Sequence, residues 1–521
     1  MDGLRQQSSQ IKLDKIHVSG FLKRFLFEKL LIVDKIAISI GGALMPLAYS
    51  PYDLFLLPFV SYTLLIVVCR KYKAKKVLAL TWLFSFTQFS WGILWVYESF
   101  HLYTEVPQFI AVILSLLFAA FISCYSAIAM WFSKIIWKND EQMWMIAGIP
   151  ISIVCMEWLR GHTFGGFPWM YVGHSQSDSW LSGYMPLIGS LSTGIIVIVC
   201  ASILTLMVLG RISFTRACAC LAIVFGLGNS LQFAPWTKPF GNPIKVSLLQ
   251  GNVKQGEKWD ANQVEIAQQW YLASTKSVST SNLIIWPESA IANYHREVKP
   301  FLRSLSASID KSKTDVISGM YFLSSNERNA SYYNSLYTTS GERYDKRHLV
   351  PFGEYYPWSM APDWLQTYLS FPHARVIANI ASEGVLHYQG LSYGVSICYE
   401  LAYTSLVFNR KDIKFLVSAS NDGNFEGSNE PFQHNQIARI RALESKKFLA
   451  RSSNNGISAI INPGGEMMAY SELSKTQIVS GDIQPMSGNT PYVIFGDLPL
   501  LLVGGFILFA TLYRRHVVSV H

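Results

Sequence analysis

The chain carries two kinds of hydrophobic pattern. Long apolar runs fill the part before about residue 240, and several of them, such as 77–97, 108–133 and 190–210, contain no Asp, Glu, Lys or Arg. Each is about as long as the roughly 20 residues that an α-helix needs to cross a bilayer. We therefore expect seven transmembrane helices before a globular domain and an eighth after it. Their expected positions are 31–50, 53–69, 77–97, 108–131, 145–159, 184–209, 217–231 and 492–513.

Between about residues 245 and 487, short apolar runs alternate with polar and charged segments, as in a water-soluble domain. Runs typical of β-strands recur there, and helical stretches separate several of them, which predicts α/β layers around a sheet. The predicted strands are 244–249, 283–286, 315–320, 335–338, 393–397, 415–417, 448–450 and 458–461, and the predicted helices include 261–275 and 434–447. The pattern divides the chain into a membrane region at 1–240, a globular domain at 241–487 and a final anchor with a short tail at 488–521.

The basic residues indicate how the chain crosses the membrane. Lys and Arg cluster in the N-terminal leader, after the second, fourth and sixth predicted spans, and after the last span. By the positive-inside rule these segments face the cytoplasm, which places the globular domain on the outer side. The formal charge of +9 does not indicate nucleic-acid binding, because no stripe of basic residues with interleaved aromatics is present. The leader also lacks the features of a cleavable signal peptide, so the first span is expected to remain in the mature protein.

Cys398 is the first candidate for chemistry. It ends the strand-like run 393–397, and it is the only cysteine after residue 245. Glu288 follows another predicted strand and a proline, and Lys346 lies in a segment of mixed charge with Pro and Gly. Taken singly, an isolated cysteine is most often a small hydrophobe, a carboxylate at a strand end is often a cap, and a lysine is often solvated. Together the three supply a nucleophile, a base and a cation, which suit acyl transfer through a thioester.

The order Glu288, Lys346, Cys398 resembles the nitrilase or carbon–nitrogen hydrolase superfamily, whose fold is an αββα sandwich and whose triad is Glu-Lys-Cys. With seven predicted spans before the domain and one after it, the whole chain resembles the apolipoprotein N-acyltransferase family, a membrane-embedded member of that superfamily. The matching motifs are Gly165-Gly166-Phe167-Pro168-Trp169, Gln250-Gly251-Asn252, Trp286-Pro287-Glu288, Lys346 through Tyr355, Ile397-Cys398-Tyr399-Glu400, and Gln433-His434 through Asn455-Gly456. One departure is Gly423-Asn424-Phe425, which stands where the family usually carries Ala-Trp-Phe.

The resemblance implies a role for each matching residue. Cys398 would be the nucleophile, Glu288 the general base, and Lys346 the cation that stabilises a thiolate or oxyanion. The supporting residues would be Glu354, Tyr399 and Glu400. Members of the family take an acyl chain from a phospholipid, typically phosphatidylethanolamine. They pass it through a thioester to the α-amine of the diacylglyceryl-cysteine at a lipoprotein's N-terminus.

The same resemblance implies a compartment and a set of partners. It places the chain in the inner membrane of a Gram-negative bacterium, with the catalytic domain in the periplasm. The expected partners are the phospholipid donor and the diacylglyceryl-apolipoprotein acceptor, and no cofactor is expected. No His/Cys/Asp/Glu spacing in the domain resembles a zinc site.

An acyl-enzyme in such a protein must be shielded from water until the acceptor arrives. The aromatic-rich segment 352–380 is a candidate lid, and Trp358 and Trp364 belong to it. Trp169, in a loop rich in glycine and aromatic residues between two predicted spans, and Trp259 are further candidates for the substrate entrance. Ordinary loop packing, or an aromatic belt at the membrane interface, would explain the same pattern.

Two other functions are compatible with parts of the sequence. A membrane-anchored nitrilase-type amidase would hydrolyse a small amide with the same three residues, but it would not need seven spans before the domain. A transporter or scaffold with an inactive domain would not need Glu288, Lys346 and Cys398 together. The pattern therefore favours an acyltransferase, and an acyl-enzyme that depends on lipid would distinguish it from both alternatives.

Overall fold

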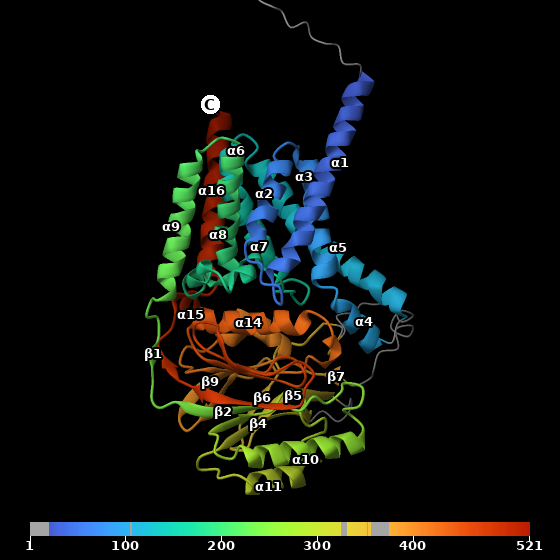
Figure 1. Cartoon of the computed structure of the whole chain (residues 1–521), viewed down its shortest axis with the longest axis vertical. Helices are drawn as coiled ribbons and strands as arrows, with labels where there is room; N and C mark the ends of the chain where they lie inside the picture. Colours follow the sequence, from blue (N-terminus) through green and yellow to red (C-terminus); the bar gives the residue numbers. More distant parts are fainter. Residues whose placement is uncertain (1–19, 105–106, 325–330, 352, 356–374, 521) are drawn as a thin grey trace, which may run out of the picture.

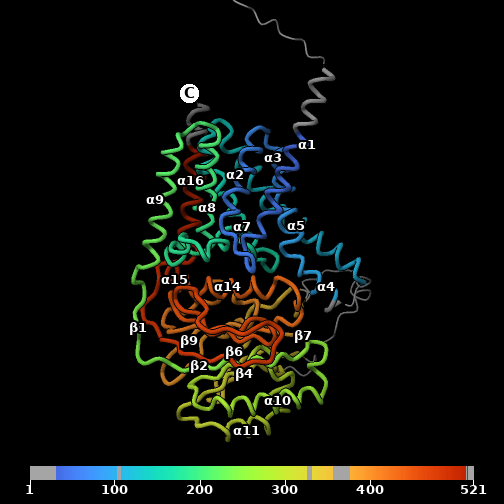
Figure 2. The backbone as a smooth tube through the Cα atoms, in the orientation of Figure 1, coloured from blue at the N-terminus to red at the C-terminus, as the bar shows by residue number. Residues whose placement is uncertain are grey.

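The computed structural model describes residues 20–104, 107–324, 331–351, 353–355 and 375–520. A bundle of helices forms one end of the molecule and a domain of two β-sheets forms the other (Figure 1). The chain leaves the bundle through α9 (Phe214–Gln232) and β1 (Lys238–Pro239). It returns through β15 (Met486–Ser487), α15 (Pro491–Phe495) and α16 (Leu498–Val520), a path that the tube in Figure 2 makes easy to follow. The outgoing and returning segments pair, because β1 and β15 are antiparallel neighbours.

Each of the eight expected spans coincides with a helix. These helices are α1 (Gly20–Leu44), α2 (Leu57–Cys69), α3 (Ala74–Gly92), α5 (Gln108–Ile136), α7 (Ile149–Arg160), α8 (Met185–Val208), α9 (Phe214–Gln232) and α16 (Leu498–Val520). Within the described ranges, five helical stretches are long and apolar enough to cross a membrane, so the count of eight spans stays a prediction. They are Leu31–Ala48, Gln108–Ile136, Glu141–Arg160, Trp180–Val208 and Phe214–Gln232.

Two sheets form the centre of the globular domain. The first has the strand order β13 (Met467–Tyr470), β12 (Ala459–Ile461), β11 (Leu449–Ser453), β10 (Leu416–Ser420), β9 (Leu391–Ile397) and β8 (Val385–Tyr388). The second has the order β14 (Gln477–Ile483), β2 (Ile244–Gln250), β3 (Leu283–Ile285), β4 (Asp315–Leu323), β5 (Ser331–Thr338) and β6 (Arg343–Asp345), with β7 (Arg375–Val376) paired to β5. Apolar side chains from both sheets share one core, which includes Val246 and Leu248 from one sheet and Val395 and Val417 from the other.

Helices cover both outer faces of this pair of sheets. Helices α10 (Ala261–Ser277) and α11 (Lys299–Ala307) pack on the second sheet, and α14 (Glu430–Ser445) covers the first (Figure 1). The domain is therefore an αββα sandwich, as expected. Helix α14 also faces the membrane helices, because its Ile437 and Ala438 join the hydrophobic core of the bundle. A helix enclosed on both sides has little exposed surface, and nearly all of α14 is buried.

The topology brings the candidate residues to one edge. Strands β2, β3 and β4 are parallel in one sheet, and β9, β10 and β11 are parallel in the other. Glu288 follows the carboxyl end of β3, and Cys398 follows the carboxyl end of β9. Open α/β sheets place their binding sites at such strand ends.

Candidate active site

Cys398 occupies a sharp turn between β9 and the short helix η5 (Cys398–Ala402). Its φ of 53° lies in the left-handed region, which residues other than glycine seldom adopt. Such a conformation persists only where the surroundings hold it, and it is concentrated at functional sites. The turn leaves Cys398 partly exposed, while the next two residues, Tyr399 and Glu400, are buried.

Lys346 lies between two carboxylates in a buried cluster. Its Nζ is 2.8 Å from Glu354 Oε1 and 3.3 Å from Glu288 Oε1, and its side chain is 1% exposed. Asn334 Nδ2 donates to Glu288 Oε1 at 2.7 Å, and the backbone N–H of Asn421 donates to Glu288 Oε2 at 2.9 Å. Glu288 is therefore held by donors on both oxygens. The structure brings Glu288, Lys346 and Glu354 into direct contact.

The charges of this cluster act on Cys398. Burial raises the pKa of the Cys398 thiol well above its ordinary value, and the negative charge of Glu288 raises it further, whereas Lys346 opposes the shift. Burial alone would lower the pKa of Lys346, but Glu288 and Glu354 raise it well above the ordinary value. Near neutral pH the site thus holds a protonated thiol beside a fixed cation and a carboxylate. Such a thiol becomes a nucleophile when a base takes its proton, and the cation stabilises the charge that results.

Glu400 and Tyr399 hold the turn around Cys398. Glu400 Oε1 accepts from the backbone N–H groups of Arg347 and His348 at 2.6 and 3.1 Å, and Oε2 accepts from the backbone of Ile397 at 2.8 Å. Glu400 therefore links the backbone after Lys346 to the backbone before Cys398, whereas Glu354 contacts the Lys346 ammonium directly. The Tyr399 hydroxyl donates to the Gly166 carbonyl at 2.8 Å, which ties the same turn to the loop after α7.

An apolar pocket opens on the membrane side of Cys398. It encloses about 1000 Å³ of space, counting the part open to its surroundings. Its walls include Phe118, Phe121 and Ile122 of α5, the aromatic rings of Phe167 and Trp169, and Val350, Pro351, Cys398 and Tyr399. The thiol thus lies between a charged cluster in the domain and an apolar cavity built partly by a membrane helix.

The tryptophans considered for the entrance lie in different places. Trp169 is 2% exposed in the pocket wall, where its Nε1 donates to Gln433 Oε1 at 2.8 Å. Trp259 is 50% exposed and stacks on Tyr321 with ring centroids 5.1 Å apart. Trp358 and Trp364 lie outside the described residues. Where the family usually carries Ala-Trp-Phe, Phe425 keeps an aromatic contact, because its ring and that of Trp95 form a T-shaped pair in the pocket wall, with centroids 5.2 Å apart.

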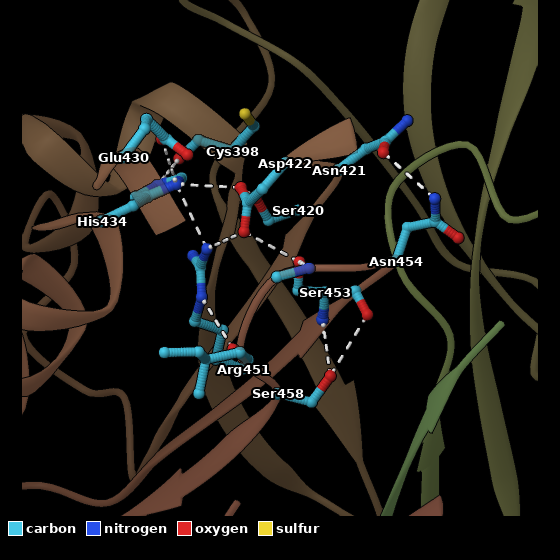
Figure 3. Close-up of polar contacts among 12 residues, drawn as sticks. Cys398, Ser420, Asn421, Asp422, Glu430, His434, Arg451, Ser453, Asn454 and Ser458 are labelled. Atoms are coloured by element: carbon cyan, nitrogen blue, oxygen red, sulfur yellow. Dashed lines mark hydrogen bonds and ion pairs between the residues drawn. The ribbon is translucent and has the colours of Figure 1, made fainter. Parts of the chain in front are cut away.

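A second charged cluster next to Cys398 was missed by the sequence reasoning (Figure 3). Asp422 Oδ2 accepts from Arg451 Nη2 and from Ser453 Oγ, each at 2.8 Å. Asp422 Oδ1 accepts from Ser420 Oγ at 2.5 Å and lies 3.1 Å from His434 Nδ1. The other ring nitrogen of His434 is 3.1 Å from the backbone carbonyl oxygen of Cys398. We call Asp422, His434 and Arg451 the Asp422 cluster.

Three possible metal-ligand atoms also meet at this point. The ligand atoms of Cys398, Asp422 and His434 lie within 4.8 Å of one another, a grouping that the linear spacing did not indicate. Both oxygens of Asp422 already accept hydrogen bonds, and the Arg451 guanidinium supplies a positive charge at the same place. The donor set therefore fits a hydrogen-bonded ion pair better than it fits a cation.

Lys258 is another charged residue that the sequence reasoning did not single out. It precedes α10 and is 8% exposed. Burial lowers its pKa to about 8, although the charges of Glu288 and Glu354 oppose this shift. Its own charge also acts on Cys398. The candidate site thus contains a second buried lysine, whose protonation changes within the ordinary range of pH.

Comparisons with known proteins cover both parts of the molecule. Residues 41–203 match the family model described as apolipoprotein N-acyltransferase N-terminal domain, and residues 245–492 match the carbon-nitrogen hydrolase model. The chain is 34% identical to a Methylococcus capsulatus protein named apolipoprotein N-acyltransferase, across 92% of this chain and 96% of that protein. A Coxiella burnetii protein of the same name is 32% identical, across 91% of this chain and 98% of its own length.

A Vibrio cholerae protein with that name is 30% identical, across 92% of this chain and 97% of its own length. Among solved structures, Saccharomyces cerevisiae Nit3, a member of branch 10 of the nitrilase superfamily, matches with 17% identity and a TM-score of 0.36. That match covers 48% of this chain and 92% of Nit3. The sequence relatives extend over both the helical bundle and the sandwich domain. On that evidence, the chain belongs to the apolipoprotein N-acyltransferase family.

Proposed function

We propose that the protein transfers an acyl chain from a phospholipid, through a thioester on Cys398, to the α-amine of the diacylglyceryl-cysteine of a lipoprotein. One observation carries the mechanism: Cys398 lies between the Lys346 cluster, formed by Lys346, Glu288 and Glu354, and an apolar pocket that α5 helps to form. The relatives named apolipoprotein N-acyltransferase support the reaction, since they match nearly the whole chain. The polar side suits proton transfer and charge stabilisation, and the apolar side suits a fatty acyl chain.

In the first half-reaction, Glu288 takes the Sγ proton of Cys398, and the thiolate attacks the ester carbonyl of the phospholipid. Lys346 stabilises the negative charge that develops, because it is buried and its pKa is raised. The carbon–oxygen bond then breaks, and the departing alcohol of the lysophospholipid takes the proton from Glu288. The acyl chain remains on Cys398 as a thioester and occupies the apolar pocket.

In the second half-reaction, the α-amine of the acceptor attacks the thioester carbonyl. A carbon–nitrogen bond forms, the carbon–sulfur bond breaks, and Glu288 transfers the proton lost by the nitrogen to the Cys398 thiolate. The thioester preserves the activation of the acyl group while the second substrate replaces the first. We therefore expect ping-pong kinetics.

The proposal includes a place in the cell. The basic clusters support an orientation in which the sandwich domain faces the periplasm and the helices lie in the inner membrane of a Gram-negative bacterium. Residues 1–240 would form the membrane region, 241–487 the catalytic domain, and 488–521 the closing helix and cytoplasmic tail. Phosphatidylethanolamine is the proposed donor.

The central test is the acyl-enzyme itself. Mass spectrometry of protein purified from membranes should find a fatty-acyl thioester on Cys398 that hydroxylamine removes. Cys398→Ala should lack this adduct and should not acylate a diacylglyceryl-peptide. Acylation found at another cysteine only, with Cys398→Ala fully active, would contradict the proposal.

The segment 352–380 is proposed as a lid that keeps water from the thioester. Replacing Trp358 and Trp364 together by alanine should increase the release of free fatty acid and slow acylation of the acceptor, because water would reach the acyl-enzyme. Trp180→Ala, at an exposed tryptophan on the bundle, is the control. The lid is wrong if the double variant matches the wild type in both acyl-enzyme formation and lipoprotein acylation.

A membrane-anchored amidase is not favoured. It would use the same nucleophile but would not need an apolar pocket built jointly by the sandwich domain and α5. A small-amide substrate that is hydrolysed in the absence of any phospholipid would support that alternative, whereas lipid-dependent thioester formation supports the acyltransferase.

A further inference from the structure

Glu430 places a carboxylate in the wall of the apolar pocket beside Cys398. It is the first residue of α14, and its side chain is 3% exposed. Oε1 lies 3.3 Å from His434 Nδ1, whereas Oε2 has no hydrogen-bond partner among the described residues. Figure 3 shows Glu430 at the edge of the Asp422 cluster, with His434 between it and Asp422. Glu430 is therefore a buried acid that is satisfied on only one of its two oxygens.

The surrounding charges leave this oxygen without a donor. Arg451 is nearby, but its Nη2 donates to Asp422 at 2.8 Å, and its Nη1 makes no hydrogen bond to Glu430 or to any other described residue. Burial raises the pKa of Glu430, and the negative charge of Asp422 raises it further, while His434 and Arg451 oppose the shift. A buried carboxylate oxygen without a hydrogen bond is costly, and the loss is recovered when a donor meets it. Most of the other pocket walls are apolar or aromatic, so the missing donor is expected to come with a ligand.

A purely structural role explains the position of only one of the two carboxylate oxygens of Glu430. An acidic residue in the first turn of a helix interacts favourably with the helix dipole, and Glu430 also pairs with His434 one turn later. Both interactions can be made with Oε1 alone. Neither requires the second oxygen to lie buried in the wall of a substrate pocket.

We propose that Glu430 forms a binding site for a primary ammonium group of a substrate, next to Cys398. This inference rests on the proposed function, in which a primary amine occurs in both half-reactions. One is the ethanolamine headgroup of the donor, and the other is the α-amine of the acceptor, which would bind as the ammonium and give one proton to Glu430 before its nitrogen attacks the thioester. An ammonium group carries both the charge and the N–H donors that a buried carboxylate lacks, so the pair forms a charge-assisted hydrogen bond.

The site can be tested without turnover, by protecting Cys398 from alkylation in the full-length protein. Hexadecylammonium and hexadecanol share one apolar chain and differ in the polar group. We expect hexadecylammonium to protect the Cys398 peptide at roughly tenfold lower concentration than hexadecanol, because charge-assisted hydrogen bonds are about twice as strong as neutral ones. In Glu430→Gln this advantage should disappear, while protection by hexadecanol should be unchanged.

The control variant is Glu426→Gln, which makes the same change at an exposed position four residues earlier. It should keep the advantage of hexadecylammonium. Equal protection by the two probes in the wild type would overturn the proposal. An undiminished advantage in Glu430→Gln would also overturn it. Protection by hexadecanol serves as the measure that the pocket of each variant is correctly folded.

Two further measurements distinguish the source of the ammonium. If the headgroup binds Glu430, Glu430→Gln should slow thioester formation from phosphatidylethanolamine by about tenfold and leave phosphatidylglycerol unaffected. If the acceptor binds there, thioester formation from both lipids should be unchanged, and transfer to a diacylglyceryl-peptide should slow. If Glu430→Gln slowed the reactions of every substrate equally, or slowed none of them, the proposed ammonium site would be contradicted. A wild-type protein that forms no thioester would contradict the proposed function, and the alkylation test would then decide the ammonium site by itself.

Discussion

Two buried charged clusters flank Cys398, and they differ in how they reach it. In the Lys346 cluster, formed by Lys346, Glu288 and Glu354, the charges of Glu288 and Lys346 act on the sulfur atom and shift its pKa. Asp422 also acts on the sulfur atom, because its negative charge raises the thiol pKa and its carboxylate lies within 4.8 Å of Sγ. The Asp422 cluster differs in that it also holds the backbone of Cys398, since His434 Nε2 lies 3.1 Å from the carbonyl oxygen.

The carboxylates of the two clusters are held by different partners. Both oxygens of Asp422 accept hydrogen bonds, and its pKa is lowered below the ordinary value because Arg451 and His434 outweigh the effect of burial. Glu288 also accepts on both oxygens, and one of its donors is the Lys346 ammonium. Arg451 Nη1 in one cluster, and Asn334 Oδ1 beside Glu288 in the other, have no partner among the described residues, so neither network is closed. We infer that buried charge alone does not identify a catalytic residue.

The largest expected effect is on thioester formation and comes from a change in the Lys346 cluster. Glu288→Gln keeps the shape of the side chain but cannot take the Cys398 proton, so thioester formation should fall by about 10²–10⁴-fold. The rate is measured by mass spectrometry of Cys398 after mixing with phospholipid vesicles. Glu297→Gln, at an exposed glutamate nearby, should behave as the wild type. Thioester formation by Glu288→Gln at the wild-type rate would remove the distinction between the two clusters.

The next largest effect is expected in the Asp422 cluster, and it is on the stability of the fold rather than on the reaction. Arg451→Met leaves Asp422 buried without its cation, and breaking a buried pair in this way costs about 3–5 kcal/mol. Thermal unfolding in detergent should therefore shift to lower temperature, while molecules that remain folded still form the thioester. Arg410→Met, at an exposed ion pair, is the control and should change little. A fully stable but inactive Arg451→Met protein would place this cluster in the chemistry.

This loss of stability should depend on pH. In the wild type the folded-state pKa of Asp422 is lowered, so its contribution to stability is present above the ordinary aspartate pKa and is lost as the pH falls. Without Arg451, the carboxylate becomes neutral at a higher pH than in the wild type. The difference in unfolding temperature between Arg451→Met and the wild type should therefore narrow under acidic conditions.

The smallest expected effect concerns Lys258. Its pKa is lowered to about 8, so the side chain is charged below that pH and neutral above it. The rate of thioester formation should decrease severalfold as the pH rises through this value, because a positive charge near Cys398 is lost. Lys258→Arg retains its charge at higher pH and should maintain the rate there. Identical pH profiles for the two proteins would exclude Lys258 from the electrostatics of the site.

Much of the architecture could be predicted from local patterns. Uninterrupted apolar runs located the helices of the bundle, and short β-branched runs located the central strands, since both signals lie within single segments. The edge strands β6, β8, β13 and β14 escaped prediction. β14 is partly exposed and contains Gln477, Ser480 and Asp482, so its composition does not resemble that of a buried strand. It forms because the neighbouring strand β2 offers a partner along its whole length.

The candidate site could be predicted to a similar extent: signals within one segment were recognisable, whereas contacts between distant segments were not. Glu288, Lys346 and Cys398 could be proposed because each lies in a recognisable motif. The Asp422 cluster could not, because its members come from different elements, and the packing of α14 on the sheet brings them together. A usable signal did exist, since Arg451 interrupts an apolar strand-like run and a charge at such a position requires a buried partner. Lys258 gave no comparable signal, because a lysine in a polar loop is ordinarily solvated.

The loop after α7 has a consequence for handling the protein. The carbonyl oxygens of Gly165 and Gly166 accept hydrogen bonds from His348, Tyr399 and Tyr403, which belong to the segments that carry Lys346 and Cys398. A truncated form containing only the sandwich domain would lose both acceptors together with one wall of the pocket. Even if such a fragment were soluble, it would be a poor guide to inhibitor design. A compound selected against the fragment would bind a turn around Cys398 that differs in shape from the turn in the intact protein. Screening is better done on the intact membrane protein.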